Sequence, residues 1–103
     1  MKKIHRNESG QLHRIDGHAV EHSDGSKYWY INGKRHREDG PACEDSDGDK
    51  EWFINGKLHR EDGPAIEYSD GYKRWFLNDM EYSEEEEYHQ ELIKLKLERL
   101  KNL

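Results

Sequence analysis

The feature that most constrains this chain is an internal repeat of 23 residues. Three windows, covering residues 12–34, 35–57 and 58–80, align without gaps, and twelve of the 23 positions are identical in all three copies. The identical positions include a His-Arg pair, an Asp-Gly pair and a tryptophan. Repetition within one chain shows what each structural unit needs. It divides the chain into a repeat region, residues 1–82, and a C-terminal segment, residues 83–103.

Each repeat contains two turn signals on either side of an aromatic run. The first is Ser-Asp-Gly and the second is Asn-Gly, which becomes Asn-Asp in the third copy. Asp-Gly and Asn-Gly accept positive φ, so a two-residue reversal is predicted at each signal. The predicted cross-strand pairs are Val20–Trp29, Ala19–Tyr30, Cys43–Trp52 and Ile66–Trp75. The prediction is a mainly β fold: a single-layer antiparallel meander with about two strands per repeat and one C-terminal α-helix.

This register decides which side chains share a face, because side chains alternate along a strand. It places the three tryptophans, the Ile or Leu two residues after each, and Val20, Cys43 and Ile66 on one face. That face is the more apolar and is expected to be the core side. The second face carries the alanines together with Tyr30, Phe53, Phe76 and the glutamates Glu21, Glu44 and Glu67.

The C-terminal segment has the pattern of an amphipathic helix from Ser83 to Leu100. Ser83 followed by Glu84, Glu85 and Glu86 is typical of a capping box, and basic residues gather near the other end of the segment, as the helix dipole favours. The apolar positions spread over roughly 200° of the helix surface; they are Tyr88, Leu92, Ile93, Leu95, Leu97 and Leu100. One contact with a sheet does not require so wide a stripe. The helix is therefore expected to cover the sheet and to pair with a second chain as well, or to cover a neighbour's sheet.

Composition narrows the class of protein. Hydrophobic residues make up 31% of the chain and charged residues 39%, so a thin ordered protein is expected instead of a thick core. A single cysteine, Cys43, excludes an internal disulfide and fits a reducing cytoplasm. The N-terminus lacks the apolar segment of a signal peptide, and no run reaches the ~20 apolar residues of a membrane span. The predicted location is the cytoplasm.

The repeat resembles the MORN repeat, a β-hairpin unit that reads Gly-Lys, variable, His-Gly, variable, Gly. The period covers residues 12–80, and the matched positions are Gly33, Lys34, His36, Gly40, Gly56, Lys57, His59 and Gly63. The match departs at Arg37 and Arg60, where the usual form has glycine, and in an inserted Glu-Asp. The Leu-His-Arg-Glu-Asp-Gly-Pro-Ala variant is similar to short repeat proteins of bacteriophages and large viruses. The resemblance implies a binding protein without catalytic residues, and a phage origin.

The His-Arg-Glu-Asp cluster at residues 59–62 contains the side chains of general acid/base catalysis. An enzyme places its reactive groups once, whereas this cluster occurs at the same offset in the second repeat and in reduced form in the first. We interpret it as a corner between hairpins. There Asp accepts backbone hydrogen bonds, Gly takes positive φ, Pro41 or Pro64 starts the next strand, and Arg pairs with Asp or Glu. No catalytic residue and no cofactor is predicted.

Binding of metal, nucleic acid or lipid is less favoured by the pattern. Equivalent histidines lie two strands apart, close to 10 Å, so they do not share one ion, and no metal site is predicted. The tryptophans with nearby lysines resemble a base-stacking platform, but a core ladder needs the same spacing and a row of glutamates repels phosphate. A net charge of −6 and a helix that begins with glutamates disfavour anionic lipid. Cys43 replaces a valine and an isoleucine of the sister repeats and is expected to be buried and inert.

The sequence therefore favours a non-catalytic protein-binding module. With the phage resemblance, the expected partner is a host enzyme or defence complex in the host cytoplasm, which the acidic surface inhibits by masking a basic groove. A nucleic-acid- or lipid-binding repeat protein and a small metal-binding protein remain as alternatives. The predicted contact residues are Tyr28, Tyr30, Phe53, Arg74 and Phe76 on a solvent-facing side of the sheet, with His36, Arg37, His59 and Arg60 at exposed corners.

Overall fold

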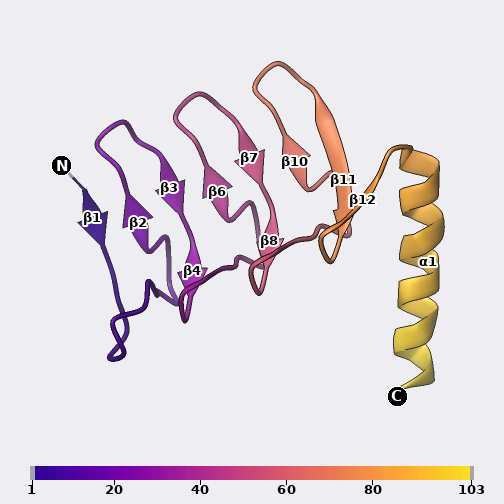
Figure 1. The fold of residues 1–103 in the computed structure, drawn as a ribbon, viewed down its shortest axis with the longest axis horizontal. Coiled ribbons are helices and arrows are strands. Elements are labelled where there is room, and N and C mark those ends of the chain that lie inside the picture. The colour runs from indigo at the N-terminus through magenta and orange to yellow at the C-terminus, as the bar shows by residue number, and fades with distance from the viewer. Residues whose placement is uncertain (1, 103) are drawn as a thin grey trace.

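The structure, a computed structural model, describes residues 2–102. It is a row of antiparallel hairpins that ends in a helix (Figure 1). The principal extents are 44 × 37 × 17 Å, and the short dimension is that of a single layer. The prediction of a mainly β, single-layer antiparallel fold with one C-terminal helix is confirmed.

Eight strands form the main sheet and follow the order of the chain. They are β1 (Lys3–Ile4), β2 (Val20–Glu21), β3 (Lys27–Tyr28), β6 (Cys43–Glu44), β7 (Lys50–Glu51), β10 (Ile66–Glu67), β11 (Lys73–Leu77) and β12 (Met80–Tyr82). Two small hairpins lie outside this sheet: β4 (Tyr30–Ile31) with β5 (Lys34–Arg35), and β8 (Phe53–Ile54) with β9 (Lys57–Leu58).

The first two repeats thus contain four short strands each, not two. The aromatic strand is interrupted at Trp29, whose N–H donates to Ala42 while its carbonyl accepts from the N–H of His36. The tryptophan therefore marks the point where the chain leaves the main sheet for the small hairpin. Trp52 makes the equivalent bonds with Ala65 and His59. In the third repeat β12 folds straight back on β11, and that strand is continuous.

The two turn signals form different loops. Asn32 and Gly33 both have positive φ, 48° and 81°, which gives the predicted two-residue reversal. The Ser-Asp-Gly loops instead have three residues, since the N–H of His22 donates to the carbonyl of Ser26. Asp24 does not take positive φ; its Oδ1 accepts the N–H of Ser26 at 2.9 Å, and Gly25 alone has positive φ.

This extra loop residue overturns the predicted register. The observed partners are Val20–Tyr28, Cys43–Glu51 and Ile66–Arg74 instead of pairs with Trp29, Trp52 and Trp75. A shift of one residue moves side chains to the opposite face. Ile66 therefore packs with Phe76, which was placed on the other face, in a buried cluster that also contains Ala65. The prediction that Phe76 faces solvent is wrong, because only 5% of it is exposed.

One row of the sheet is a ladder of alternating charges. Cα partners across the strands run in the order Lys3, Glu21, Lys27, Glu44, Lys50, Glu67, Lys73. Each glutamate has a lysine on both sides, and opposite charges on neighbouring strands contribute about 0.2–1 kcal/mol per pair. The row of glutamates is thus neutralised within the sheet, and it is not the source of negative potential that the sequence indicated.

The helix α1 (Glu85–Lys101) confirms the predicted element but not its cap. In the described part of the chain, Glu84 is the N-cap residue and makes no side-chain capping hydrogen bond. The reason is that β12 extends to Tyr82, so Ser83 and Glu84 are used to turn the chain from strand to helix. The acidic first turn and basic last turn are as predicted.

The apolar stripe of α1 divides in two. Tyr88 and Leu92 are buried against Leu77, with Leu95 packed at the margin, so the helix covers the end of its own third repeat. Figure 1 shows it beside β11 and β12 at one end of the row, not across the face of the sheet. The other part of the stripe is exposed: Ile93 to 58%, Leu97 to 54% and Leu100 to 63%.

Candidate functional site

The corner of each repeat, residues 13–17, 36–40 and 59–63, is organised by its arginine. The Nε of Arg60 donates to Asp62 at 2.8 Å, and its Nη1 donates to the carbonyl of Pro64 at 3.0 Å and to Glu67 at 2.9 Å. Arg37 makes the same three contacts one repeat earlier. The arginine thus holds the corner to the strand that follows it.

The arginine also covers the tryptophan of the preceding repeat. The Cζ atom lies 3.8 Å from the ring centroid in both Arg37 over Trp29 and Arg60 over Trp52. A cation over an indole face is attracted by the ring quadrupole. Trp75 has no following repeat, and Tyr88 of α1 lies against it instead, with 4.8 Å between ring centroids. The helix therefore takes the place of a fourth corner.

The corner glycines make room for the arginine. A Cβ atom built on Gly63 would lie 2.8 Å from Cζ of Arg60, and one on Gly40 would lie 2.9 Å from Cζ of Arg37. Both glycines have ordinary backbone conformations, so the prediction that they supply positive φ is wrong. The aspartates accept from the arginine, which confirms that pair, but within residues 2–102 neither Asp39 nor Asp62 accepts a hydrogen bond from a backbone N–H.

The corner histidines join neighbouring repeats. Nδ1 of His36 accepts the N–H of Asn55 at 2.9 Å, and Nδ1 of His59 accepts the N–H of Asn78 at 3.0 Å. His13 does the same for Asn32. An accepting Nδ1 places the ring proton on Nε2, where His59 donates to Glu61 at 2.7 Å. His59 is only 9% exposed, so the prediction that this histidine is an exposed contact is wrong.

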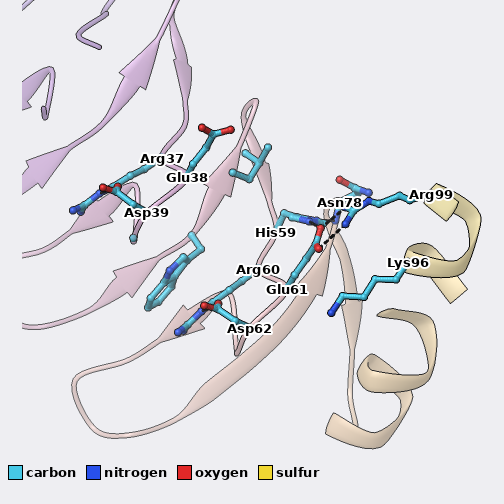
Figure 2. Close-up of a pocket in the computed structure, with 13 residues that line it drawn as sticks. Arg37, Glu38, Asp39, His59, Arg60, Glu61, Asp62, Asn78, Lys96 and Arg99 are labelled. Carbon is cyan, nitrogen blue, oxygen red and sulfur yellow. Dashed lines mark hydrogen bonds and ion pairs between the residues drawn. The ribbon is translucent and has the colours of Figure 1, made fainter. Parts of the chain in front are cut away.

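An open groove of about 850 Å³ lies between the corners of the second and third repeats and α1 (Figure 2). It brings together the predicted residues Arg37, His59 and Arg60, while His36 lines the equivalent groove between the first two repeats. Within residues 2–102 every buried side-chain nitrogen or oxygen has a hydrogen-bond partner. The groups that resemble a catalytic cluster are therefore engaged in holding the repeats together.

Glu61 links the third corner to the helix. Both oxygens of its carboxylate accept from Arg99 of α1, and one accepts from His59 (Figure 2). The bond with Arg99, followed by that with His59, lowers the pKa of Glu61 to about 2. Its side chain is 28% exposed and that of Arg99 is 53% exposed, so solvent screens much of the attraction.

We expect this contact to make stability depend on acid pH. A carboxyl whose folded-state pKa lies below its reference value of 4.5 contributes stability above pH 4.5 and loses it as the pH falls towards 2. After allowance for screening, the contribution is on the order of 1 kcal/mol. Urea unfolding of the parent and Glu61→Gln proteins at pH 7 and pH 2.5 measures it: the two proteins should differ at pH 7 and converge at pH 2.5. An equal difference at both pH values would contradict this assignment.

The predicted aromatic contact residues mostly have partners within the chain. The hydroxyl of Tyr28 donates to Asp45 at 2.7 Å, which raises its pKa to about 12. Tyr30 accepts from Arg35, which also lies over Phe53. The half-buried Arg74 pairs with Glu81 on the neighbouring strand. These residues form no single exposed cluster with the corner groove.

The sequence reading missed the Ser-Asp-Gly tips, which form an acidic edge of the sheet. We define the acidic edge as Asp24, Asp45, Asp47, Asp49 and Asp70; its tips point the same way along one side of the row in Figure 1. Successive tips are joined: Ser46 donates to Ser26 and to Asp24, and the N–H of Ser69 donates to Asp49 at 2.7 Å. The sequence does carry a signal for this edge: every Ser-Asp-Gly tip contains an aspartate, and Asp45 and Asp49 lie beside the second tip.

Two further groups have simple structural roles. Asp45, Asp47 and Asp49 lie close enough for oxygens of all three to be within 4.8 Å of one another. Each, however, accepts a hydrogen bond within the fold, from Tyr28, the N–H of Asp49 and the N–H of Ser69 respectively. Cys43 is fully buried, and burial raises its pKa to about 12, so its thiol stays protonated and is not a nucleophile.

Neither a protein-family model nor a curated protein nor a solved structure matches this chain. In the described part of the chain, residues 2–102, α1 is too short and too polar to cross a membrane, and it is the only helix there.

Proposed function

We propose that this chain is a non-catalytic module that binds a basic surface of another protein through its acidic edge. The observation that carries the proposal is the ordered row of tip aspartates. Neighbouring strands lie about 4.8 Å apart, so equivalent tips, two strands apart, repeat about every 10 Å. A rigid row of like charges costs free energy within the fold, and a partner with complementary charges relieves that cost.

The corners support a non-catalytic role. The corner side chains hold the repeats together through hydrogen bonds; they are Arg37, Arg60 and His59. A reaction that required these side chains to break those hydrogen bonds would destabilise the fold. The charge ladder of the sheet is nearly neutral, so its lysines and glutamates offset one another, whereas the aspartates of the tips form a row of like charge. Basic protein surfaces are therefore favoured as partners over nucleic acid or anionic lipid.

Three further parts belong to the same proposal. The resemblance to MORN-like repeats of phages supports a phage-encoded inhibitor that acts in the host cytoplasm. Its target is a host enzyme or defence complex, and the acidic edge masks a basic groove of that target. The exposed stripe of α1, namely Ile93, Leu97 and Leu100, supports self-association of two copies.

The acidic edge is tested by removing its charge while keeping its shape. Asparagine in place of Asp24, Asp47 and Asp70 retains the side-chain oxygen that accepts the N–H two residues on. We expect a protein partner to be captured from a bacterial lysate by the parent chain and identified by mass spectrometry. Its affinity for the triple variant should fall roughly tenfold or more, and binding should weaken steeply with salt.

The matched control changes the same number of charges elsewhere, with glutamine in place of the exposed Glu8, Glu84 and Glu98. This variant should retain the partner. Retention of nucleic acid without a protein partner, in a salt-sensitive manner, would overturn the proposal. Equal loss of the partner in both triple variants would show that net charge, not the edge, governs binding.

A further inference from the structure

The exposed side of α1 has the spacing of a coiled-coil seam. Ile93, Leu97 and Leu100 are separated by four and three residues, which is the alternation that keeps one side of a helix facing a partner helix. Glu86 and Gln90 continue the same line towards the N-terminus. At about 100° per residue this line lies well away from the side that Tyr88 and Leu92 bury. The helix thus has two apolar sides, and its own sheet covers one of them.

We propose that a second copy of this chain covers the other side, with the two α1 helices antiparallel. The inference rests on the self-association proposed above and adds its orientation and register. In this pairing Ile93 contacts Leu97 of the partner subunit, and Gln90 contacts Leu100 of the partner subunit. By twofold symmetry each contact occurs twice, which is the form that a closed dimer requires.

The charges beside the seam select the antiparallel orientation. The positions that flank it on one side are Glu87, Lys94 and Lys101, and in antiparallel helices this flank faces its own copy. The register that joins Ile93 to Leu97 of the partner subunit also places Glu87 beside Lys101 of the partner subunit. Parallel helices would instead bring Lys96 beside Lys101 of the partner subunit and Glu86 against its own copy. The same antiparallel register also places Lys94 and Lys96 each beside its own copy. Antiparallel helices therefore have two Glu87–Lys101 ion pairs against two like-charge contacts, whereas parallel helices have three like-charge contacts and neither of these ion pairs.

The helix is ordered before it pairs, which lowers the cost of association. Tyr88 and Leu92 anchor it to the third repeat, and Arg99 fixes its last turns through Glu61. An isolated helix of this length is marginal in water. The seam is nevertheless short and buries less area than a standard interface. We expect a reversible dimer with a dissociation constant on the order of 10–100 µM.

The orientation has a consequence for the acidic edges. In Figure 1 α1 runs roughly along the direction of the strands, and the acidic edge lies at one end of them. A twofold axis perpendicular to the helices reverses that direction in the second copy. The dimer therefore presents its two acidic edges on opposite sides, so that it bridges two partner surfaces, whereas a parallel dimer would present both on one side.

The test is a charge exchange measured by sedimentation equilibrium of the full chain. Glu87→Lys alone and Lys101→Glu alone should each weaken the dimer about tenfold, because each creates two like-charge contacts. The double variant restores the pairing in reverse and should recover most of the parent affinity. Glu98→Lys, with the same charge change away from the seam, should leave the affinity unchanged. Circular dichroism confirms that each variant keeps its helix.

Leu97→Asp separates the orientation from self-association itself. We expect this variant to be monomeric, since it places a charge in the seam at an exposed position that the fold does not need. A parent chain that stays monomeric up to millimolar concentration would overturn both the self-association and its orientation. A dimer that Leu97→Asp dissociates, but that neither charge variant changes, would leave self-association standing and overturn the antiparallel pairing.

Discussion

Replacing Tyr88 by alanine is expected to lower the free energy of unfolding by about 3–5 kcal/mol, the usual cost of truncating a large buried side chain. Tyr88 is fully buried, lies against Trp75 and packs with Leu77 and Leu92. Its hydroxyl also donates to the carbonyl of Arg60. Loss of this ring should free α1 from the third repeat and expose Trp75. Urea unfolding followed by both tryptophan fluorescence and far-ultraviolet circular dichroism measures the effect.

Tyr88→Phe is the matched control for this prediction. It keeps the ring against Trp75 and removes the hydrogen bond to Arg60, so it should cost only about 0.5–1.5 kcal/mol. The ring contact predicts a clear separation between the two variants. If alanine and phenylalanine destabilised the protein equally, packing of the ring would not be what attaches the helix.

Tyr88 is important because it covers the surface that the last repeat of an array leaves without a neighbour. Each repeat contacts mainly its neighbours, so the last repeat leaves exposed a surface that every other repeat buries. Here that surface is the face of Trp75, which an arginine would cover if a fourth corner followed. Tyr88 covers it by a different chemical route, with an aromatic ring in place of a guanidinium. This makes α1 a terminal cap as well as a candidate dimer element.

The fold class could be predicted because its signals are local. The repeat is visible from identity alone, Asn-Gly specifies a two-residue reversal, and the helix is marked by its acidic start and basic end. Each of these depends on a few adjacent residues. The bounds and cap of the helix were less predictable, because the length of β12 decides where it begins.

The register could not be predicted from the turn signal. Whether Asp24-Gly25 makes a two-residue or a three-residue loop depends on a hydrogen bond from Ser26 to the aspartate, which the sequence permits but does not require. The error is one residue, yet in each Ser-Asp-Gly hairpin it moves the side chains of one strand to the opposite face relative to those of the other strand. The wrong expectation for Phe76 follows directly from it.

Some contacts of the corner could be predicted from the sequence and others could not. Repetition identified the corner as structural, and the pairing of arginine with aspartate and glutamate is confirmed. The tryptophan beneath the arginine was not predictable, because it belongs to the preceding repeat, eight residues earlier in sequence. The role of the glycine was missed for the same reason, since it depends on where the guanidinium passes. The aspartates of the acidic edge are visible in the sequence, but their pattern with serine and glycine predicts only turns.

A double-mutant cycle tests whether Gly63 exists to make room for Arg60. Arg60→Ala removes the cover of Trp52 and three hydrogen bonds, and we expect it to cost about 2–3 kcal/mol. Gly63→Ala places a methyl group 2.8 Å from Cζ of an arginine that is fixed at both ends, and should cost about 1–3 kcal/mol. Both effects are measured as free energies of unfolding in urea.

The sign of the glycine effect should reverse in the second background. Once Arg60 is alanine, the methyl group meets empty space, and the backbone of Gly63 is one that alanine adopts without strain. Alanine then restricts the unfolded chain, so Gly63→Ala should be neutral or stabilise by about 0.4–1 kcal/mol. Gly17→Ala offers a graded comparison, because its methyl group would lie at 3.3 Å from Arg14 in a corner that no tryptophan precedes. If the losses in free energy of unfolding were additive in the double variant, glycine would be required at position 63 by the backbone and not by the space that Arg60 occupies.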